Sequence, residues 1–197
     1  LGFLDDLLGA GESGGFRGHV AALARGRLTT GGIKLLGGAA LSLWVVDAAD
    51  PGSGGIVGIV RDAALISLAA NLANLFDRAP GRVLKVGQAA FLVLVVFAAL
   101  LGRSSGLAPV AYVAGAALAL LPSDLREESM VGDAGSNVIG AVLGLGAVTL
   151  AGPGLRWIVL AVLIGLNLLS EIVSFTKVID ATPPLRWLDR LGSPHRS

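Results

Sequence analysis

Long apolar stretches recur along this chain, and they limit its fold more than any other feature. Each has roughly 15 to 20 residues, near the length that an α-helix needs to cross a bilayer. Hydropathy and Gly/Pro punctuation place them at 31–48, 56–76, 85–101, 107–121, 137–151 and 156–174. We therefore predict an all-α fold. It is a polytopic transmembrane helical bundle of about six spans plus a partial N-terminal helix, in a single integral membrane domain over 1–197.

The composition supports a membrane class and excludes several functions. Charged residues make up 15% of the chain, whereas soluble domains carry about 25%. Glycine accounts for 29 of the 197 residues, which suits close packing of helices in lipid. The absence of cysteine excludes disulfides, thiol catalysis and cysteine zinc sites. A net charge of +1 gives no argument for a nucleic-acid partner.

The basic residues are concentrated in alternate connections between the predicted spans. The connections rich in Lys and Arg, counted with the adjacent helix ends, are 10–30, 77–84, 122–136 and 175–197. The others are short and rich in Gly and Pro: 49–55, 102–106 and 152–155. By the positive-inside rule the first set is cytoplasmic. We predict a multi-pass protein of the cell membrane, with the lipid bilayer as a partner and the tail 175–197 in the cytoplasm.

Carboxylates from distant parts of the sequence lie at predicted helix ends on this cytoplasmic side: Asp5, Asp6, Asp77 and Asp133. Ionisable groups beside hydrocarbon are costly and usually functional. Any one of them could instead only cap a helix end in headgroup-level water. Because all of them reach one membrane face together with polar neighbours, we interpret them as parts of one site.

The segment "NLANLFDRAPGRVLKVG", residues 71–87, places polar groups in a row at the end of a span. Asn71, Asn74 and Asp77 recur at helical spacing and so share one side of a helix. The stripe could serve helix–helix hydrogen bonding, which suits Asn71 best. That alternative suits Asp77 less, because Asp77 lies at the loop beside Arg78.

The segment "MVGDAGSNVIGAVLG", residues 130–144, places Asp133 before a span that we expect to start near Asn137. The simplest interpretation is an N-cap aspartate stabilised by the helix dipole. Gly132 and Gly135 would also allow a ligand to approach the backbone closely. A helix N-terminus together with a carboxylate is what a phosphate–magnesium complex needs.

Taken in order, "FLDDLLG", "NLANLFD" and "MVGDAGS" resemble the polyprenyl-phosphate N-acetylhexosamine-1-phosphate transferases, which include the phospho-MurNAc-pentapeptide transferases. The resemblance covers essentially the whole chain. It implies transfer of a sugar-1-phosphate from a UDP-sugar to a polyprenyl phosphate such as undecaprenyl phosphate, with release of UMP and a requirement for Mg²⁺. Family members have more helices, so the resemblance also implies that N-terminal helices are missing here.

The resemblance implies roles for residues at matching positions. Asp133 is similar to the family's magnesium ligand, and Asp77 with Asn74 matches its asparagine–aspartate motif near the metal and nucleotide. Asp5 and Asp6 match its acidic pair, which is associated with the lipid phosphate. The remaining candidates for substrate binding are Lys34, Asn71 and His195. Lys34 matches a lysine of the first cytoplasmic loop, although its spacing from the acidic pair is longer here.

The chain departs from the family pattern at several places. Pro80 stands where the family often has another aspartate, and the histidine-rich loop before the last helix is missing. The tail carries a single histidine, His195, which is either a sugar contact or a solvated tail residue. These departures leave the identity of the sugar open.

Two rival interpretations remain beside the transferase. A small-solute transporter would explain polar groups near membrane helices, but it should place charge near the bilayer midplane. Asp62, beside Arg61, is the exception to the clustering of charge at one face, and it lies toward the outer end of its span. The third interpretation is an inactive paralogue or scaffold. The oligomeric state is undecided, with a homodimer as one alternative.

Overall fold

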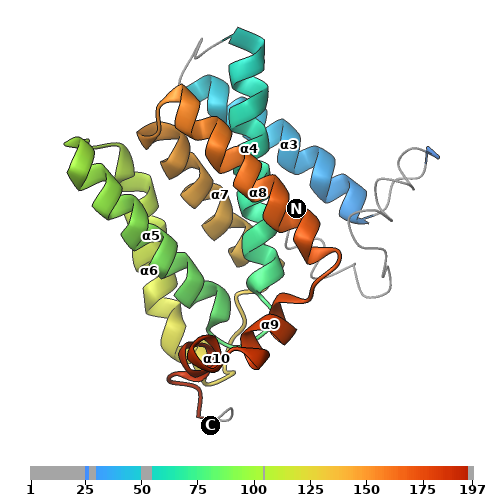
Figure 1. The fold of residues 1–197 in the computed structure, drawn as a ribbon, viewed down its shortest axis with the longest axis vertical. Helices are drawn as coiled ribbons and strands as arrows, with labels where there is room; N and C mark the ends of the chain where they lie inside the picture. The colour runs from blue at the N-terminus through green and yellow to red at the C-terminus, as the bar shows by residue number, and fades with distance from the viewer. Residues whose placement is uncertain (1–24, 27–29, 50–54, 104, 195–197) are drawn as a thin grey trace.

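The computed structural model describes residues 25–26, 30–49, 55–103 and 105–194. Within these ranges the regular structure is helical throughout, so the all-α prediction is confirmed (Figure 1). The helices are α3 (Thr30–Ala49), α4 (Gly55–Phe76), α5 (Arg82–Leu101), η1 (Ser105–Leu107), α6 (Ala108–Leu125), α7 (Gly132–Leu150), α8 (Pro153–Ser170), α9 (Phe175–Ala181) and α10 (Pro183–Arg190).

The long helices match the predicted spans. In the described part of the chain, five helices are long and apolar enough to cross a membrane, namely α4 to α8, and α3 adds the shorter apolar stretch Gly37–Ala48. Large apolar side chains such as Leu92, Val93 and Val96 of α5 point outward. Outward apolar side chains suit lipid rather than water, so the chain is a multi-pass membrane protein.

Several helix boundaries differ from the predicted ones. The span predicted at 137–151 begins at Gly132, the span at 85–101 begins at Arg82, and the span at 107–121 runs on to Leu125. Hydropathy locates only the apolar part of a helix. The backbone continues helically into polar residues at the headgroup level, and Asp133 therefore lies inside α7 rather than before it.

The helix α4 is central and packs against α3, α7 and α8. Its contact with α7 is so close that Gly140 has no space for a side chain. A Cβ atom there would lie 2.3 Å from the Ala69 carbonyl oxygen and 2.7 Å from the Cα of Ala70. A Cβ on Gly144, one turn further along, would lie 3.0 Å from the Cα of Ile66. Small residues at this spacing bring two membrane helices into backbone contact.

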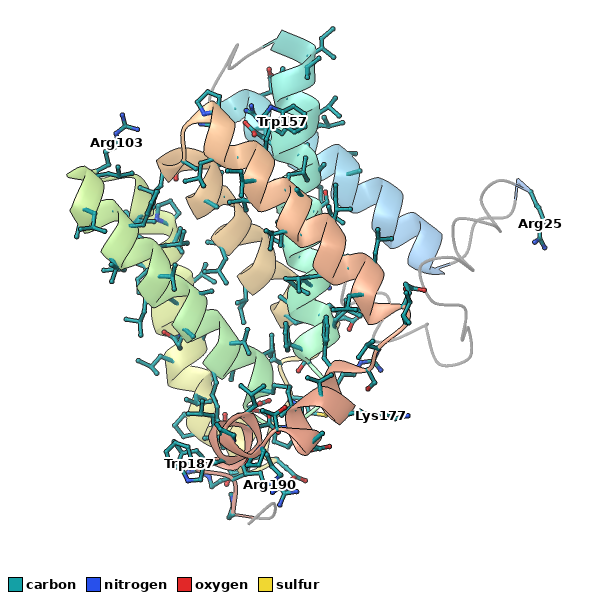
Figure 2. The ribbon with its side chains drawn as sticks, viewed as in Figure 1. Arg25, Arg103, Trp157, Lys177, Trp187 and Arg190 are labelled. Atoms are coloured by element: carbon teal, nitrogen blue, oxygen red, sulfur yellow. The ribbon has the colours of Figure 1, made fainter. Side chains whose placement is uncertain are left out.

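The two ends of the bundle carry different groups (Figure 2). Lys177, Trp187 and Arg190 lie at the end where α9 and α10 are found, which we call the α10 end. Arg103 and Trp157 lie at the opposite end, the Trp157 end. The connections α4–α5 and α6–α7 belong to the α10 end. This alternation of connections agrees with the order of spans predicted from the sequence.

A buried ion cluster holds the Trp157 end together. The Asp62 carboxylate is fully buried and accepts hydrogen bonds from Arg61 Nε at 2.6 Å and from Arg156 Nη1 of α8 at 2.6 Å. The Arg61 guanidinium also lies over the Trp157 ring, 5.6 Å from its centroid. Asp62 therefore joins α4 to α8, and its charge is paired within the protein.

Cysteine labelling can test the predicted orientation. The chain has no native cysteine, so single-cysteine variants report one position each. A membrane-impermeant maleimide should label Arg103→Cys in intact cells, because Arg103 is exposed at the Trp157 end. Lys177→Cys, exposed at the α10 end, should react only after permeabilisation. The reverse pattern would place the α10 end outside the cell and contradict a cytoplasmic site.

Candidate functional site

The register of α4 against α7 brings two of the predicted motifs to one level of the bundle. Gly144 faces Ile66, Gly140 faces Ala70, and Ser136 Oγ donates a hydrogen bond to Asn74 Oδ1 at 3.0 Å. Each step of four residues along α4 is matched by four residues in the reverse direction along α7. Three residues further on, this antiparallel register reaches Asp77 on the α4 side and Asp133 on the α7 side.

Both aspartates lie at the α10 end and are partly exposed. Asp77 follows the last residue of α4, and its N–H donates to the Asn74 carbonyl at 3.1 Å. Asp133 lies in the first turn of α7, where the helix dipole favours a negative charge. The site is therefore an acidic and polar end of one tightly packed helix pair, with Ser136 fully buried beneath it.

The structure gives Gly132 and Gly135, the glycines on either side of Asp133, local roles in backbone conformation and packing. Gly132 has φ of +61°, a left-handed conformation that favours glycine. A Cβ on Gly135 would lie 2.6 Å from Cγ1 of Val131. The N-cap residue is Val131, which makes no side-chain capping bond. Asp133 is thus not the N-cap residue, and the Asn137 side chain donates to its carbonyl oxygen from one turn further along the helix.

The segment after α8 packs beside Asp77. Phe175, at the start of α9, stacks on Phe76 with the ring centroids 5.1 Å apart. Arg82, at the start of α5, forms a buried ion pair with Asp189 of α10 (Nε–Oδ1 2.6 Å) and donates to Thr176 Oγ1 at 2.8 Å. The residues on both sides of the α4–α5 connection therefore hold α9 and α10 against this end of the bundle.

Asp124 fixes the two connections that lie next to the predicted aspartates. Its buried carboxylate accepts hydrogen bonds from the N–H of Gly81, at 2.5 Å, and from the N–H of Val131, at 3.2 Å. Gly81 precedes α5 with φ of +69°. Asp124 thus joins the α4–α5 connection after Asp77 to the α6–α7 connection before Asp133.

Asp124→Ala should lower stability, because it leaves two backbone N–H groups without their acceptor at a buried position. We expect a loss of about 1–3 kcal/mol in the free energy of unfolding. Thermal unfolding of the detergent-solubilised protein measures it. Glu128→Ala is the matched control, since Glu128 is an exposed carboxylate of the same connection that pairs with Arg126 at 2.9 Å. Equal melting temperatures for the two variants would contradict the role given to Asp124.

The sequence placed Asp124, Arg82 and Asp189 in the predicted cytoplasmic connections but did not identify the partners that they bind there. Asp124 is followed by two glutamates in "LPSDLREES", Asp189 is the single acid of "LRWLDR", and neither has a spacing that indicates a site. The one available signal is a single acid within a short basic segment, which here marks a buried partner for Arg82.

The other predicted site residues are placed as follows. The Asn71 amide donates to Asn167 Oδ1 of α8 at 2.7 Å, which is the helix–helix alternative that the sequence left open. Lys34 lies within α3 rather than in a loop, and the start of α3 lies out at the side of the bundle (Figure 1). Asp5, Asp6 and His195 lie outside the described residues. Their predicted roles, like that of Lys34, stay predictions.

The donor set at this end suits a magnesium ion that keeps water and substrate oxygens among its ligands. Within the described ranges, no group of three or more His, Cys, Asp or Glu side chains is placed to hold a metal. Magnesium is commonly bound by only one or two carboxylates, with phosphate oxygens and waters completing the octahedron. Asp77 and Asp133 fit that requirement in chemistry and number.

The chain matches no protein-family model, no curated protein and no solved structure. The fold and this site define a multi-pass α-helical membrane protein with two carboxylates at one end of a closely packed helix pair. A more specific assignment therefore depends on the three sequence motifs and on this geometry, and it is made below as a proposal.

Proposed function

We propose that the chain is a magnesium-dependent phosphoglycosyltransferase. It would move a sugar-1-phosphate from a UDP-N-acetylhexosamine to a polyprenyl phosphate, releasing UMP, in the synthesis of a cell-envelope glycopolymer. The observation that carries the proposal is the α4–α7 register, since it places "NLANLFD" beside "MVGDAGS" although about 60 residues separate Asn74 from Ser136.

In the proposed reaction an oxygen of the polyprenyl phosphate forms a bond to the β-phosphorus of the UDP-sugar. The bond from that phosphorus to the oxygen bridging the two phosphates breaks, and UMP leaves with that oxygen. Phosphoryl transfer of this kind depends mainly on positioning and on neutralising charge. A bound magnesium ion would neutralise charge on the diphosphate oxygens.

Different residues of the chain would bind the metal ion, the nucleotide and the lipid phosphate. Asp77 and Asp133 would hold the ion, and the N-terminus of α7 would favour the negative diphosphate. Asn74, held by Ser136, would present its amide to the nucleotide side. We propose Asp5 and Asp6 for the lipid phosphate, with Lys34 and His195 as further phosphate or sugar contacts. The site lies at the bundle end, where lipid headgroups and a water-borne UDP-sugar meet.

The described contacts favour this proposal over a transporter. A transporter should carry ionisable groups near the bilayer midplane that are available to a solute. Asp62, the clearest acid within a span, is fully buried and paired with Arg61 and Arg156. That arrangement supports a structural role in joining α4 to α8.

Radiolabelled UDP-N-acetylhexosamines, each incubated in turn with undecaprenyl phosphate, magnesium and the detergent-solubilised chain, test the proposal. Labelled lipid together with released UMP is the expected result. Solute uptake by proteoliposomes without labelled lipid would favour the transporter. Absence of both activities in a protein that melts cooperatively would favour the scaffold.

A further inference from the structure

The short helix α10 has a two-sided pattern that the proposed transferase does not use. At about 100° per residue, its apolar and basic side chains separate onto opposite sides. The apolar side holds Pro184, Trp187 and Leu188, with the C-cap residue Leu191 next to them, and the basic side holds Arg186 and Arg190. Trp187 is 63% exposed, Leu188 51% and Leu191 52%, so this apolar face is not covered by the described part of the protein.

The charge that α10 presents outward is positive. Its acid, Asp189, is buried and paired with Arg82, with Nε–Oδ1 at 2.6 Å and Nη2–Oδ2 at 2.9 Å. Arg186 and Arg190 are exposed. The Arg186 guanidinium donates a hydrogen bond to the backbone carbonyl of Asp180, at 3.3 Å. A partner for this helix should therefore combine an apolar layer with negative charge.

The position of α10 in the bundle indicates that this partner is the membrane surface. The helix lies across the ends of the spans and is seen nearly end-on in Figure 1, whereas the spans run along the page. The first turn of α5 holds it there, through Arg82 and through Lys85, whose Nζ donates to the carbonyls of Leu188 at 3.2 Å and Asp189 at 2.7 Å. Because α5 is itself a membrane-spanning candidate, its first turn marks the level of the lipid headgroups.

We propose that α10 is an interfacial helix that binds the anionic lipid surface of the bilayer holding the spans. Trp187, Leu188 and Leu191 enter the boundary between headgroups and acyl chains, and Arg186 and Arg190 bind lipid phosphates. Basic amphipathic helices with aromatic side chains bind membranes in this way, and anionic lipids strengthen their binding. This inference does not depend on the transferase activity.

Binding of α10 to lipid would also fix the position of α9 and α10 beside the candidate site. α9 and α10 are joined to the α4–α5 connection by the Phe76–Phe175 stack and the Arg82–Asp189 ion pair. An interfacial α10 therefore keeps this segment beside Asp77 at the membrane surface.

Spin labels on single cysteines can test the depth of α10 in the intact chain. The chain is placed at one copy per nanodisc, in phosphatidylcholine alone or mixed with phosphatidylglycerol. Labels are attached at Leu188→Cys and Arg190→Cys, with Val96→Cys on the outer face of α5 as the lipid reference and Glu128→Cys as the aqueous reference. Collision with oxygen reports lipid exposure, and collision with a nickel chelate reports water exposure.

We expect the Leu188 label to behave like the Val96 label, at a depth of about 5–10 Å below the headgroup boundary. The Arg190 label should react with nickel several-fold more than the Leu188 label. Adding phosphatidylglycerol should lower nickel access at Leu188 several-fold, and Arg186→Gln with Arg190→Gln should remove this dependence.

Nickel access at Leu188 equal to that at Glu128 in both lipid mixtures would overturn the proposal. Protection of Leu188 that is independent of phosphatidylglycerol would overturn the assignment of the arginines to anionic lipid. Protection of the Leu188 label that arises only when two chains share a disc would show that a second copy covers the apolar face of α10. That result would also overturn the proposal.

Discussion

Asp133→Asn is expected to reduce magnesium-dependent transfer by at least about 10²–10³-fold, the usual cost of losing one group that stabilises developing negative charge. An amide is a poor substitute for a carboxylate as a ligand of a hard cation. The folding cost should be small, since Asp133 lies in the first turn of α7 and contributes about 0.3–1 kcal/mol through the helix dipole.

Product formation at several magnesium concentrations, with melting as the folding check, measures this effect. Asp47→Asn is the matched control, because Asp47 is an exposed aspartate on α3 near the opposite end of the bundle. Asp77→Asn should resemble Asp133→Asn, and the double variant should lose little more than either single one, because both residues would hold the same ion. Parent-like turnover by a folded Asp133→Asn would refute the placement of the site.

Gly140→Leu is expected to prevent α4 and α7 from packing together. Even the first carbon of a side chain at this position would lie 2.3 Å from a backbone oxygen of α4, which a rotamer change cannot relieve. Overpacking costs about 1–3 kcal/mol where neighbouring side chains can shift. Because the obstacle here is backbone, we expect a loss at or above the upper end of that range, seen as low yield and a strongly lowered melting temperature.

Gly115→Leu is the control for Gly140→Leu, since a Cβ at Gly115 on α6 would meet no atom within 4 Å apart from its chain neighbours and the backbone of its own helix. It should melt like the parent protein. Gly144→Ala should fall between the two, because its Cβ would lie 3.0 Å from the Cα of Ile66 and 3.1 Å from the Cβ of Ala69. Parent-like melting of Gly140→Leu would show that α4 and α7 are not in backbone contact, and would remove the register on which the site depends.

The two predictions concern one structural feature. The contact through Gly140 and Gly144 fixes how far α7 slides along α4, and that register sets the level of Asp133 relative to Asp77. A variant that weakens the contact moderately, such as Gly144→Ala, should therefore lose activity before it loses its fold.

The sequence alone determined the class of fold and the order of the spans. Apolar stretches of bilayer length must form helices, since lipid offers the backbone no hydrogen-bond partners. Helix ends were harder to place, because the helices continue past their apolar parts into residues such as Arg82 and Gly132. The motifs around Asp77 and Asp133 were found because their polar residues stand out against apolar surroundings.

The tertiary structure decided which of these polar residues meet. Helical spacing places Asn71, Asn74 and Asp77 on one side of α4 but does not say what that side faces. The fold turns Asn71 toward Asn167 of α8 and Asn74 toward Ser136 of α7. It also pairs Arg82 with Asp189, about 100 residues away, and places Asp124 between two connections. Such pairings depend on how helices pack across the whole chain, and local spacing carries no record of a partner that is distant in sequence.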